Sequence, residues 1–229
     1  MKEKLFMYPG YDDNHNLKAV ELDNTIIFGN TGKGKTTVLR NMLEDIKVHN
    51  PERECESLII DASKLIPSAF IETLQGIIKT VGDRLSFLRD ERFSKSIPML
   101  VREGIDIPYN EMIIGIDNCY FGNAETSNEV IKLLNHILVY SKVAGITVIV
   151  TTQTIDNVSV ELLNNFNYRI CLPCTPETAN RVMRPNAYKE FDTLERVLLF
   201  REKCAIIHPY FVLGMTGERI SDDYEDFAK

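Results

Sequence analysis

The chain has 229 residues, of which 44% are hydrophobic and 26% are charged, close to the average for a domain with a substantial core. Its formal net charge of −7 argues against a protein that coats nucleic acid over its whole surface, because such binding needs Lys and Arg to displace counterions, so any contact with DNA must be local. No apolar run approaches the roughly 20 residues of a membrane helix, and the first residues lack the apolar core of a signal peptide.

These features predict a cytoplasmic chain that does not itself span a membrane and that would reach one only through a partner or a longer parent chain. A single domain over 1–229 is the simplest organisation. Residues 1–23 read as an N-terminal extension rich in turn-forming types, with a short strand expected over 17–22. The core is expected over 24–213, followed by a charged tail at 214–229.

From residue 25 onward, short apolar runs alternate with segments whose apolar residues recur at helical spacing. The runs do not alternate with polar residues, so they indicate strands buried on both faces of a parallel sheet and joined by helices. The predicted fold class is therefore α/β, a mostly parallel sheet with helices on both faces. The predicted strands cover 25–28, 57–61, 112–117, 146–152 and 168–172, with possible edge strands at 197–200, 204–207 and 210–213, and the predicted helices cover 35–48, 70–89, 127–143 and 160–165.

A phosphate-binding loop follows the first core strand. The segment 29–36, Gly-Asn-Thr-Gly-Lys-Gly-Lys-Thr, fits the pattern G-x-x-x-x-G-K-[ST] at every fixed position, and it lies between a predicted strand and a predicted helix. Glycines let successive backbone N–H groups turn inward around an anion at the positive end of the helix. We expect Lys35 to contact the β- and γ-phosphates of ATP and the Thr36 hydroxyl to ligate Mg²⁺. The predicted ATP-binding residues are Gly29, Asn30, Thr31, Gly32, Lys33, Gly34, Lys35, Thr36 and Thr37.

A Mg²⁺ ion held by one hydroxyl also needs a nearby carboxylate. Asp117 ends the most apolar strand outside the loop, which places it at the carboxyl edge of the sheet, where open α/β folds bind ligands. Asp61 ends another strand in the same way and is the competing candidate. We favour Asp117 as the metal ligand and interpret Asp61 as a residue that caps a turn.

The five cysteines are an odd number in a mid-sized chain, which suggests reduced thiols. Cys171, Cys174, Cys204 and His208 have spacings that zinc accepts in principle. Cys171 and Cys204 lie in apolar, strand-like runs, so we favour buried thiols over a zinc site.

With these residues identified, the chain resembles the FtsK/SpoIIIE branch of the FtsK and HerA motor ATPases over most of 17–213. Residues 57–64 are an apolar strand followed by Asp-Ala-Ser-Lys, and residues 74–88 are a long helix with an Asp-Arg pair, as in that family. Residues 140–153 contain Ala-Gly-Ile before a buried strand and Thr-Thr-Gln, and residues 162–170 end in an Arg-Ile pair. The resemblance implies a RecA-like P-loop fold of the additional-strand type, a homo-oligomeric ring that is usually hexameric, and ATP-driven movement of double-stranded DNA. It also implies that Gln153 senses the γ-phosphate and that Arg169 contacts nucleotide across a subunit boundary.

One position departs from the family pattern. Where the family places a glutamate directly after the strand-ending aspartate, this chain has Asn118. An amide can hold a water molecule but cannot accept its proton, so the general-base contribution should be largely missing. Glu125 and Glu129 could replace it only if the preceding loop folded back.

Two functions therefore remain open. The first is a motor that couples ATP to translocation of DNA. The alternative is a degenerate module that binds ATP and hydrolyses it slowly or not at all, as in the FtsK-like ATPases of type VII protein secretion, where the partner is a secreted protein. Both readings include ATP binding, and they differ in hydrolysis and in the polymer that is moved.

Overall fold

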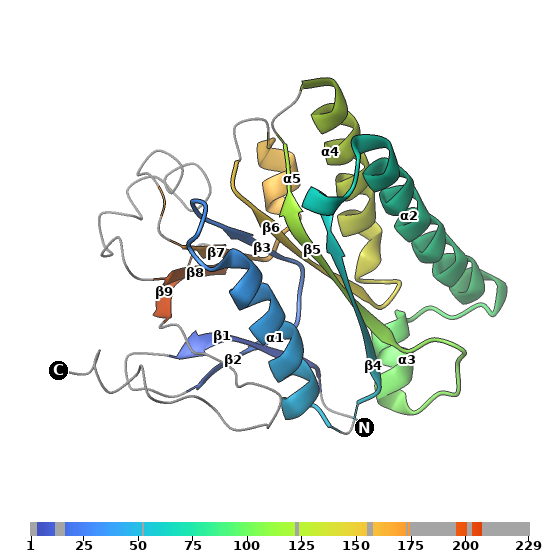
Figure 1. The fold of residues 1–229 in the computed structure, drawn as a ribbon. Coiled ribbons are helices and arrows are strands. Elements are labelled where there is room, and N and C mark those ends of the chain that lie inside the picture. Colours follow the sequence, from blue (N-terminus) through green and yellow to red (C-terminus); the bar gives the residue numbers. More distant parts are fainter. Residues whose placement is uncertain are drawn as a thin grey trace.

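The computed structural model describes residues 4–11, 17–51, 53–121, 124–154, 158–172, 174, 196–200 and 203–207. Figure 1 shows how the elements are arranged. The strands are β1 (Phe6–Tyr11), β2 (Leu17–Glu21), β3 (Thr25–Phe28), β4 (Cys55–Asp61), β5 (Glu111–Cys119), β6 (Ile146–Thr152), β7 (Tyr168–Cys171), β8 (Arg196–Phe200) and β9 (Lys203–Ile207). The helices are α1 (Lys35–His49), the short 3-10 helix η1 (Ala62–Lys64), α2 (Pro67–Asp90), α3 (Ile97–Glu103), α4 (Ala124–Ser141) and α5 (Val160–Asn164). The candidate strand at 210–213 lies outside the described residues.

The main sheet has the order β4-β5-β6-β3-β7-β8-β9. Its first five strands are parallel, and β8 and β9 add an antiparallel hairpin beside β7. The predicted α/β class is therefore confirmed. One strand, β6, is inserted between β3 and β5, which is the additional-strand arrangement that the family resemblance implied.

Helices cover both faces of this sheet (Figure 1). Successive side chains of β3 point to opposite faces: Ile26 and Phe28 belong to the core shared with α2, α4 and α5, whereas Ile27 packs with α1. The approach of α1 is close, because a Cβ placed on Gly115 of β5 would lie 3.1 Å from the Leu39 side chain. Helix α1 is thus packed closely against the middle of the sheet, and the loop 29–34 connects its N-terminus to β3.

Strand β4 forms one edge of the sheet. Its apolar run predicted a strand buried on both faces, but Leu58 and Ile59 are exposed. The helix that follows begins at Pro67, three residues before the predicted start, because proline is well suited to the first helical position.

Besides the short 3-10 helix η1, two elements were not predicted. Strand β1 pairs antiparallel with β2, and its Met7 is buried beside α1. Helix α3 carries Ile97 and Leu100 into a small cluster with Leu88 of α2. In the described ranges, none of the helices combines the length and the apolar character that crossing a bilayer requires.

Candidate functional site

The loop between β3 and α1 depends on three glycines. Gly32 and Gly34 have φ angles of 74° and 81°, in the left-handed region where other residues are strained. Gly29 is needed for a different reason, because a Cβ there would lie 2.7 Å from the Cβ of Leu172. Leu172 also donates its N–H to the Phe28 carbonyl at 2.8 Å. The segment after β7 therefore lies directly against the start of the loop.

The loop ends on an uncapped helix. Gly34 occupies the N-cap of α1, no side chain caps it, and the first turn contains no acidic residue. The first N–H groups of a helix have no partner within the helix, and the helix dipole makes this end positive. The geometry therefore suits an anion such as phosphate.

Lys35 opens this helix and is almost fully buried, with 5% of its surface exposed. Its Nζ donates to the carbonyl oxygens of Gly29 and Asn30, both at 2.9 Å. Burial lowers the pKa of Lys35, and the nearby Asp117 carboxylate partly opposes that effect. The acceptors described on the ammonium group are two neutral carbonyl oxygens, so a bound phosphate would give it a negatively charged partner. Asn30, Thr31, Lys33 and Thr37 are exposed around it, and Thr36 is half-buried.

Asp117 lies at the same edge and is 3% exposed. Its Oδ1 accepts hydrogen bonds from the Thr151 hydroxyl at 2.6 Å and from the Asn118 N–H at 3.1 Å. Its Oδ2 accepts from the Asn118 side-chain amide at a long 3.3 Å. One oxygen is therefore held firmly and the other is weakly engaged. A buried carboxylate with an available oxygen, together with the Thr36 hydroxyl on the first turn of α1, is a donor set that fits Mg²⁺.

Asp61 is paired in register with Asp117 on the neighbouring strand. Its Oδ1 accepts from the backbone N–H of Ser63 at 3.2 Å and from the Ser63 hydroxyl at 2.6 Å, and its Oδ2 lies 3.2 Å from Lys64 Nζ. These contacts cap η1. Hydrogen bonds from Ser63, and further ones from Lys64 and Asn118, lower the pKa of Asp61. The observed bonds are those of the capping role that the sequence favoured for it.

Asn118 lies between these two carboxylates. Its side-chain amide bonds Asp117, and it contributes to the lowered pKa of Asp61. Its φ of 55° is left-handed, a conformation that asparagine tolerates better than most residues, and it falls where the pairing of β5 with β6 is irregular. Its backbone N–H also donates to Thr151 at 2.8 Å. The residue that departs from the family pattern is therefore in contact with the predicted metal ligand.

Gln153 follows β6, the strand next to β3, and it reaches the phosphate loop. Its Oε1 accepts a hydrogen bond from the Thr31 hydroxyl at 2.9 Å. The structure thus brings a residue 122 positions away onto the loop. Sequence reasoning missed two further residues: Thr151, which holds Asp117, and Leu172, which packs on Gly29. Thr151 belongs to the Thr-Thr-Gln run at 151–153, but the sequence assigned no role to this residue, and Leu172 belongs to no motif. Both act through the register of neighbouring strands.

Arg169 lies in the middle of β7, in register with Ile26. Its Nη2 donates to the Leu163 carbonyl at 3.0 Å and to the Asn164 side chain at 3.1 Å, so it holds the end of α5. Burial lowers the pKa of Arg169. Its contact with nucleotide across a subunit boundary stays a prediction. Of the two substitute glutamates, Glu129 is exposed on α4, and the side chain of Glu125 lies outside what the structure describes.

The candidate zinc ligands are on different strands, with Cys171 on β7 and Cys204 on β9. Cys204 pairs with Leu199, and Leu199 pairs with Arg169, so the Cys204 backbone is level with Arg169 and two strands away from β7. Neighbouring strands are about 4.8 Å apart. Cys171 lies two residues further along β7, with Cys174 beyond it. Among the described residues, no three His, Cys, Asp or Glu side chains form a group that could hold a metal ion. His208 lies outside the described residues.

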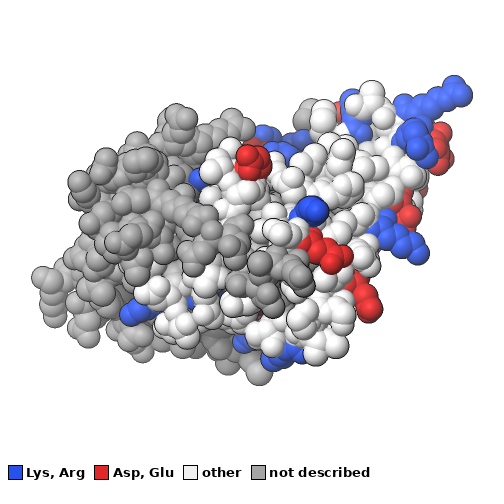
Figure 2. All heavy atoms as spheres, turned by 90° about the horizontal axis from the view of Figure 1, so that it is seen from above, with Lys and Arg blue, Asp and Glu red and all other residues white. Residues whose placement is uncertain are grey.

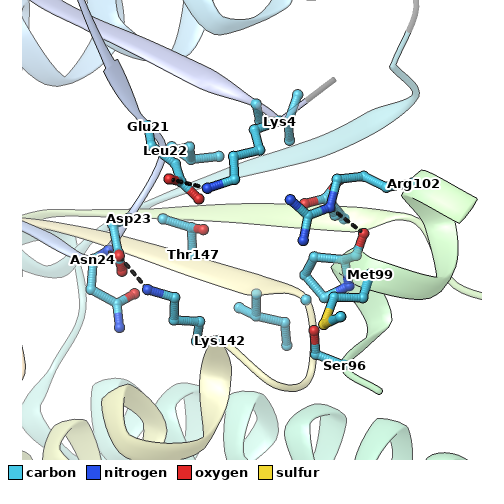
Figure 3. A pocket seen from close by; sticks show the side chains of 15 residues that line it. Lys4, Glu21, Leu22, Asp23, Asn24, Ser96, Met99, Arg102, Lys142 and Thr147 are labelled. Carbon is cyan, nitrogen blue, oxygen red and sulfur yellow. Dashed lines mark hydrogen bonds and ion pairs between the residues drawn. The ribbon is translucent and has the colours of Figure 1, made fainter. Parts of the chain in front are cut away.

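A cavity of about 250 Å³ lies at the opposite edge of the sheet, where the parallel strands begin (Figure 3). It is bordered by the segment between β2 and β3, by α3 and by the turn before β6. Charged side chains line it, but two ion pairs join them within the chain: Lys4 with Glu21 at 2.7 Å and Lys142 with Asp23 at 2.5 Å. This cavity is separate from the phosphate loop.

Figure 2 shows the molecule from the side of the carboxyl edge of the sheet. Lys and Arg are mixed with Asp and Glu over the part of the chain that the structure describes, and neither sign forms a continuous patch there. Any DNA contact on this face would have to be local, as the net charge suggested.

Comparison with solved structures finds the same fold in several ATPase domains. The cytoplasmic domain of the type VII secretion ATPase EccC of Thermomonospora curvata matches 94% of this chain with a TM-score of 0.73 and 14% identity. The conjugation coupling protein TcpA of pCW3, in its monomer form with ATPγS, matches the full chain with the same TM-score and identity. EssC (ATPases 2 and 3) of Geobacillus thermodenitrificans matches 99% of it with a TM-score of 0.67 and 15% identity.

The chain spans 29% of the EccC structure, 72% of the TcpA structure and 48% of the EssC structure. No model of a known protein family matches the sequence, and no curated protein is similar to it in sequence. At these identities the likeness establishes the fold alone: the chain has the architecture of the ATPase domains in these structures.

Proposed function

We propose that this chain is an ATP-binding motor domain of the FtsK/SpoIIIE type that couples ATP binding and hydrolysis to the movement of a polymer, with DNA as the first candidate. The observation that carries the proposal is the buried Lys35 ammonium group, which is held by two carbonyl oxygens at the uncapped N-terminus of α1 and lies near Asp117. A triphosphate would supply the negative charge that this arrangement lacks.

Each residue then has a definite task. The backbone N–H groups of the loop surround the phosphates, and Lys35 exchanges its carbonyl acceptors for β- and γ-phosphate oxygens. Thr36 and Asp117 would hold Mg²⁺, which neutralises charge on the phosphates when it is bound. Gln153 would detect whether the γ-phosphate is present, and its hydrogen bond with Thr31 of the loop supports this role.

The alternative is a module that binds ATP without rapid turnover. Asn118 favours it, because its amide is hydrogen-bonded to Asp117 and cannot take a proton from water. In this reading the domain reports nucleotide state to its neighbours, and a secreted protein replaces DNA as the substrate. An oligomeric ring, and contact of Arg169 with a neighbour's nucleotide, belong to either version.

The test of ATP binding is Lys35→Ala, with Lys33→Ala as the matched control. The Lys35 side chain is buried on the loop carbonyls, whereas the Lys33 side chain is exposed, and alanine keeps the backbone N–H through which Lys33 would contact phosphate. Loss of charge-assisted bonds worth about 1.5–3 kcal/mol should weaken ATP binding by about 10- to 100-fold in Lys35→Ala. Lys33→Ala should bind nearly as well as the natural sequence. Calorimetry with Mg·ATP measures both affinities. Equal affinities of Lys35→Ala and the natural sequence would contradict the proposal that residues 29–36 bind the phosphates of ATP.

The two versions are separated by steady-state ATP turnover with and without double-stranded DNA. A rate that DNA increases supports the motor. ATP binding without turnover under either condition supports the binding module. Light scattering with and without ATP reports whether the chain assembles, and Arg169→Ala should reduce turnover only in the assembled form.

A further inference from the structure

Two cysteines lie together beside the phosphate loop. Cys171 ends β7 and Cys174 follows it, and their Sγ atoms are 3.6 Å apart and share a hydrogen bond. A disulfide needs about 2.05 Å between the sulfurs, so closing the pair requires a movement of about 1.5 Å. The spacing C-x-x-C is also that of thiol–disulfide redox motifs.

The two thiols differ in accessibility. Cys171 is buried, and its hydrogen bond to Cys174 and its burial raise the pKa of Cys171 well above the usual range. It therefore keeps its proton. Cys174 is half-buried, so it is the more exposed residue of the two. The more exposed thiol reacts first, and the buried one resolves the product.

The segment that joins the cysteines touches the phosphate loop. Cys171 is in register with Phe28, the last residue of β3. Leu172, between the two cysteines, donates its N–H to the Phe28 carbonyl at 2.8 Å. Leu172 also fills the space in which a Cβ on Gly29 would lie. Drawing Cys174 toward Cys171 therefore pulls on a residue that packs against the first glycine of the loop.

We propose that Cys171 and Cys174 are a thiol–disulfide exchange site for small-molecule disulfides such as glutathione disulfide, and that closing it weakens ATP binding at the adjoining loop. The second half of this inference rests on the proposed function, and the first half does not. The site is separate from the residues expected to contact phosphate or metal.

The exchange proceeds in two balanced steps. The Cys174 thiolate attacks one sulfur of glutathione disulfide, which forms a mixed disulfide and releases one glutathione thiolate. Once Cys174 is in the mixed disulfide, its thiol no longer hydrogen-bonds Cys171, so the main cause of the raised Cys171 pKa is removed. Cys171 then gives its proton to the released glutathione thiolate, and the Cys171 thiolate attacks the Cys174 sulfur, which expels the second glutathione. The chain loses two hydrogen atoms, and one glutathione disulfide is reduced to two glutathione molecules. Excess glutathione reverses both steps.

The chemical half is tested by incubating the reduced chain with glutathione disulfide and measuring intact mass and disulfide-linked peptides. The natural sequence should lose two hydrogen atoms and yield a peptide that links Cys171 to Cys174. Cys171→Ser should stop at a glutathione adduct on Cys174, and Cys55→Ser should still form the bridge. Circular dichroism checks that each variant is folded. Absence of the linked peptide from the natural sequence would overturn the inference.

The coupling half is tested by measuring Mg·ATP affinity of the natural sequence in the reduced and oxidised forms. Oxidation should weaken binding by about tenfold, the equivalent of one charge-assisted bond, and dithiothreitol should restore it. The double variant Cys171→Ser/Cys174→Ser should bind equally well under both conditions. A bridge that forms and leaves ATP affinity unchanged would overturn the coupling. If the bridge forms and neither form binds ATP, the proposed function fails instead.

Discussion

The charged groups around the cavity and those around the phosphate loop, at opposite edges of the parallel sheet, have different partners, although the edge with the loop also has one ion pair, Asp61 with Lys64 at 3.2 Å. Where the strands begin, Lys4 is paired with Glu21 and Lys142 with Asp23. Where they end, the charges of Lys35 and Asp117 are held by neutral groups, and the described contacts include no ion pair between them. Charges already paired within the chain offer little to a charged ligand. Buried charges of opposite sign that are held apart are suited to one, because a phosphate and its metal ion can join them.

A cavity of about 250 Å³ lies among the paired charges at the edge where the strands begin. At the other edge, exposed loop residues surround the buried ammonium group of Lys35. Backbone N–H groups need no deep cavity to bind phosphate. The following predictions test whether ATP binding and turnover depend on the edge with Lys35 and Asp117 and not on the edge with the cavity. They run from the largest expected effect to the smallest.

Asn118→Glu should produce the largest change. A carboxylate beside Asp117 can accept the proton of an attacking water, and general bases contribute about 10²- to 10⁴-fold. ATP turnover should therefore rise by at least about 10²-fold, measured by phosphate release at saturating ATP. Asn118→Gln is the control, because it lengthens the side chain and keeps the amide. Equal turnover in both variants would mean that the base is supplied from elsewhere.

Gly29→Ala comes next, because the new Cβ would overlap Leu172. Overpacking of this kind costs about 1–3 kcal/mol, and here the displaced atoms belong to the phosphate loop. ATP affinity should fall by about tenfold and the free energy of unfolding should fall with it. The matched control is Gly82→Ala on α2, where the space around the new Cβ is open. In that variant the free energy of unfolding should rise by about 0.5–1 kcal/mol, and the affinity for ATP should not change. The same loss of affinity in both variants would contradict this prediction.

Several of these features could be predicted from the sequence, because they are encoded locally. The loop at 29–36 is a contiguous motif, and the strand at 146–152 has the bounds predicted for it. Strand β1 was missed because its Pro9-Gly10 pair is typical of a turn. The pairing of β1 with β2 is irregular between Met7 and Gly10, which is how the strand accommodates the pair.

The contacts that complete the site could not be predicted from the sequence. Thr151 and Leu172 act on residues 34 and 143 positions away, through the pairing of β5 with β6 and of β3 with β7. A single sequence does not show which residues of neighbouring strands are paired. The exposure of Leu58 and Ile59 was missed for a similar reason, since an apolar run shows that a strand forms but not that it ends at an edge.

Gln153→Ala should have a moderate effect that is confined to turnover. It removes the acceptor of the Thr31 hydroxyl, a neutral hydrogen bond worth about 1 kcal/mol. ATP affinity should change by less than about fivefold, and turnover should fall more than affinity does. Thr31→Val removes the donor from the same bond. If the contact matters, the double variant should be no worse than the worse single variant, and fully additive losses would show that the residues act separately.

Lys142→Ala should have the smallest effect, because it changes the edge where charges are already paired. Its ammonium group is exposed, and exposed ion pairs contribute about 0–1 kcal/mol. Asp23 is the informative comparison, since its carboxylate also accepts hydrogen bonds from the Asn167 side chain at 2.6 Å and from the Asn24 N–H at 2.8 Å. Asp23→Ala leaves these donors without their acceptor, so it should lower the midpoint of urea unfolding more than Lys142→Ala does. Neither variant should alter ATP affinity. A loss of ATP affinity in either would mean that the two edges are coupled, and that pairing of charges alone does not separate the functional edge from the structural one.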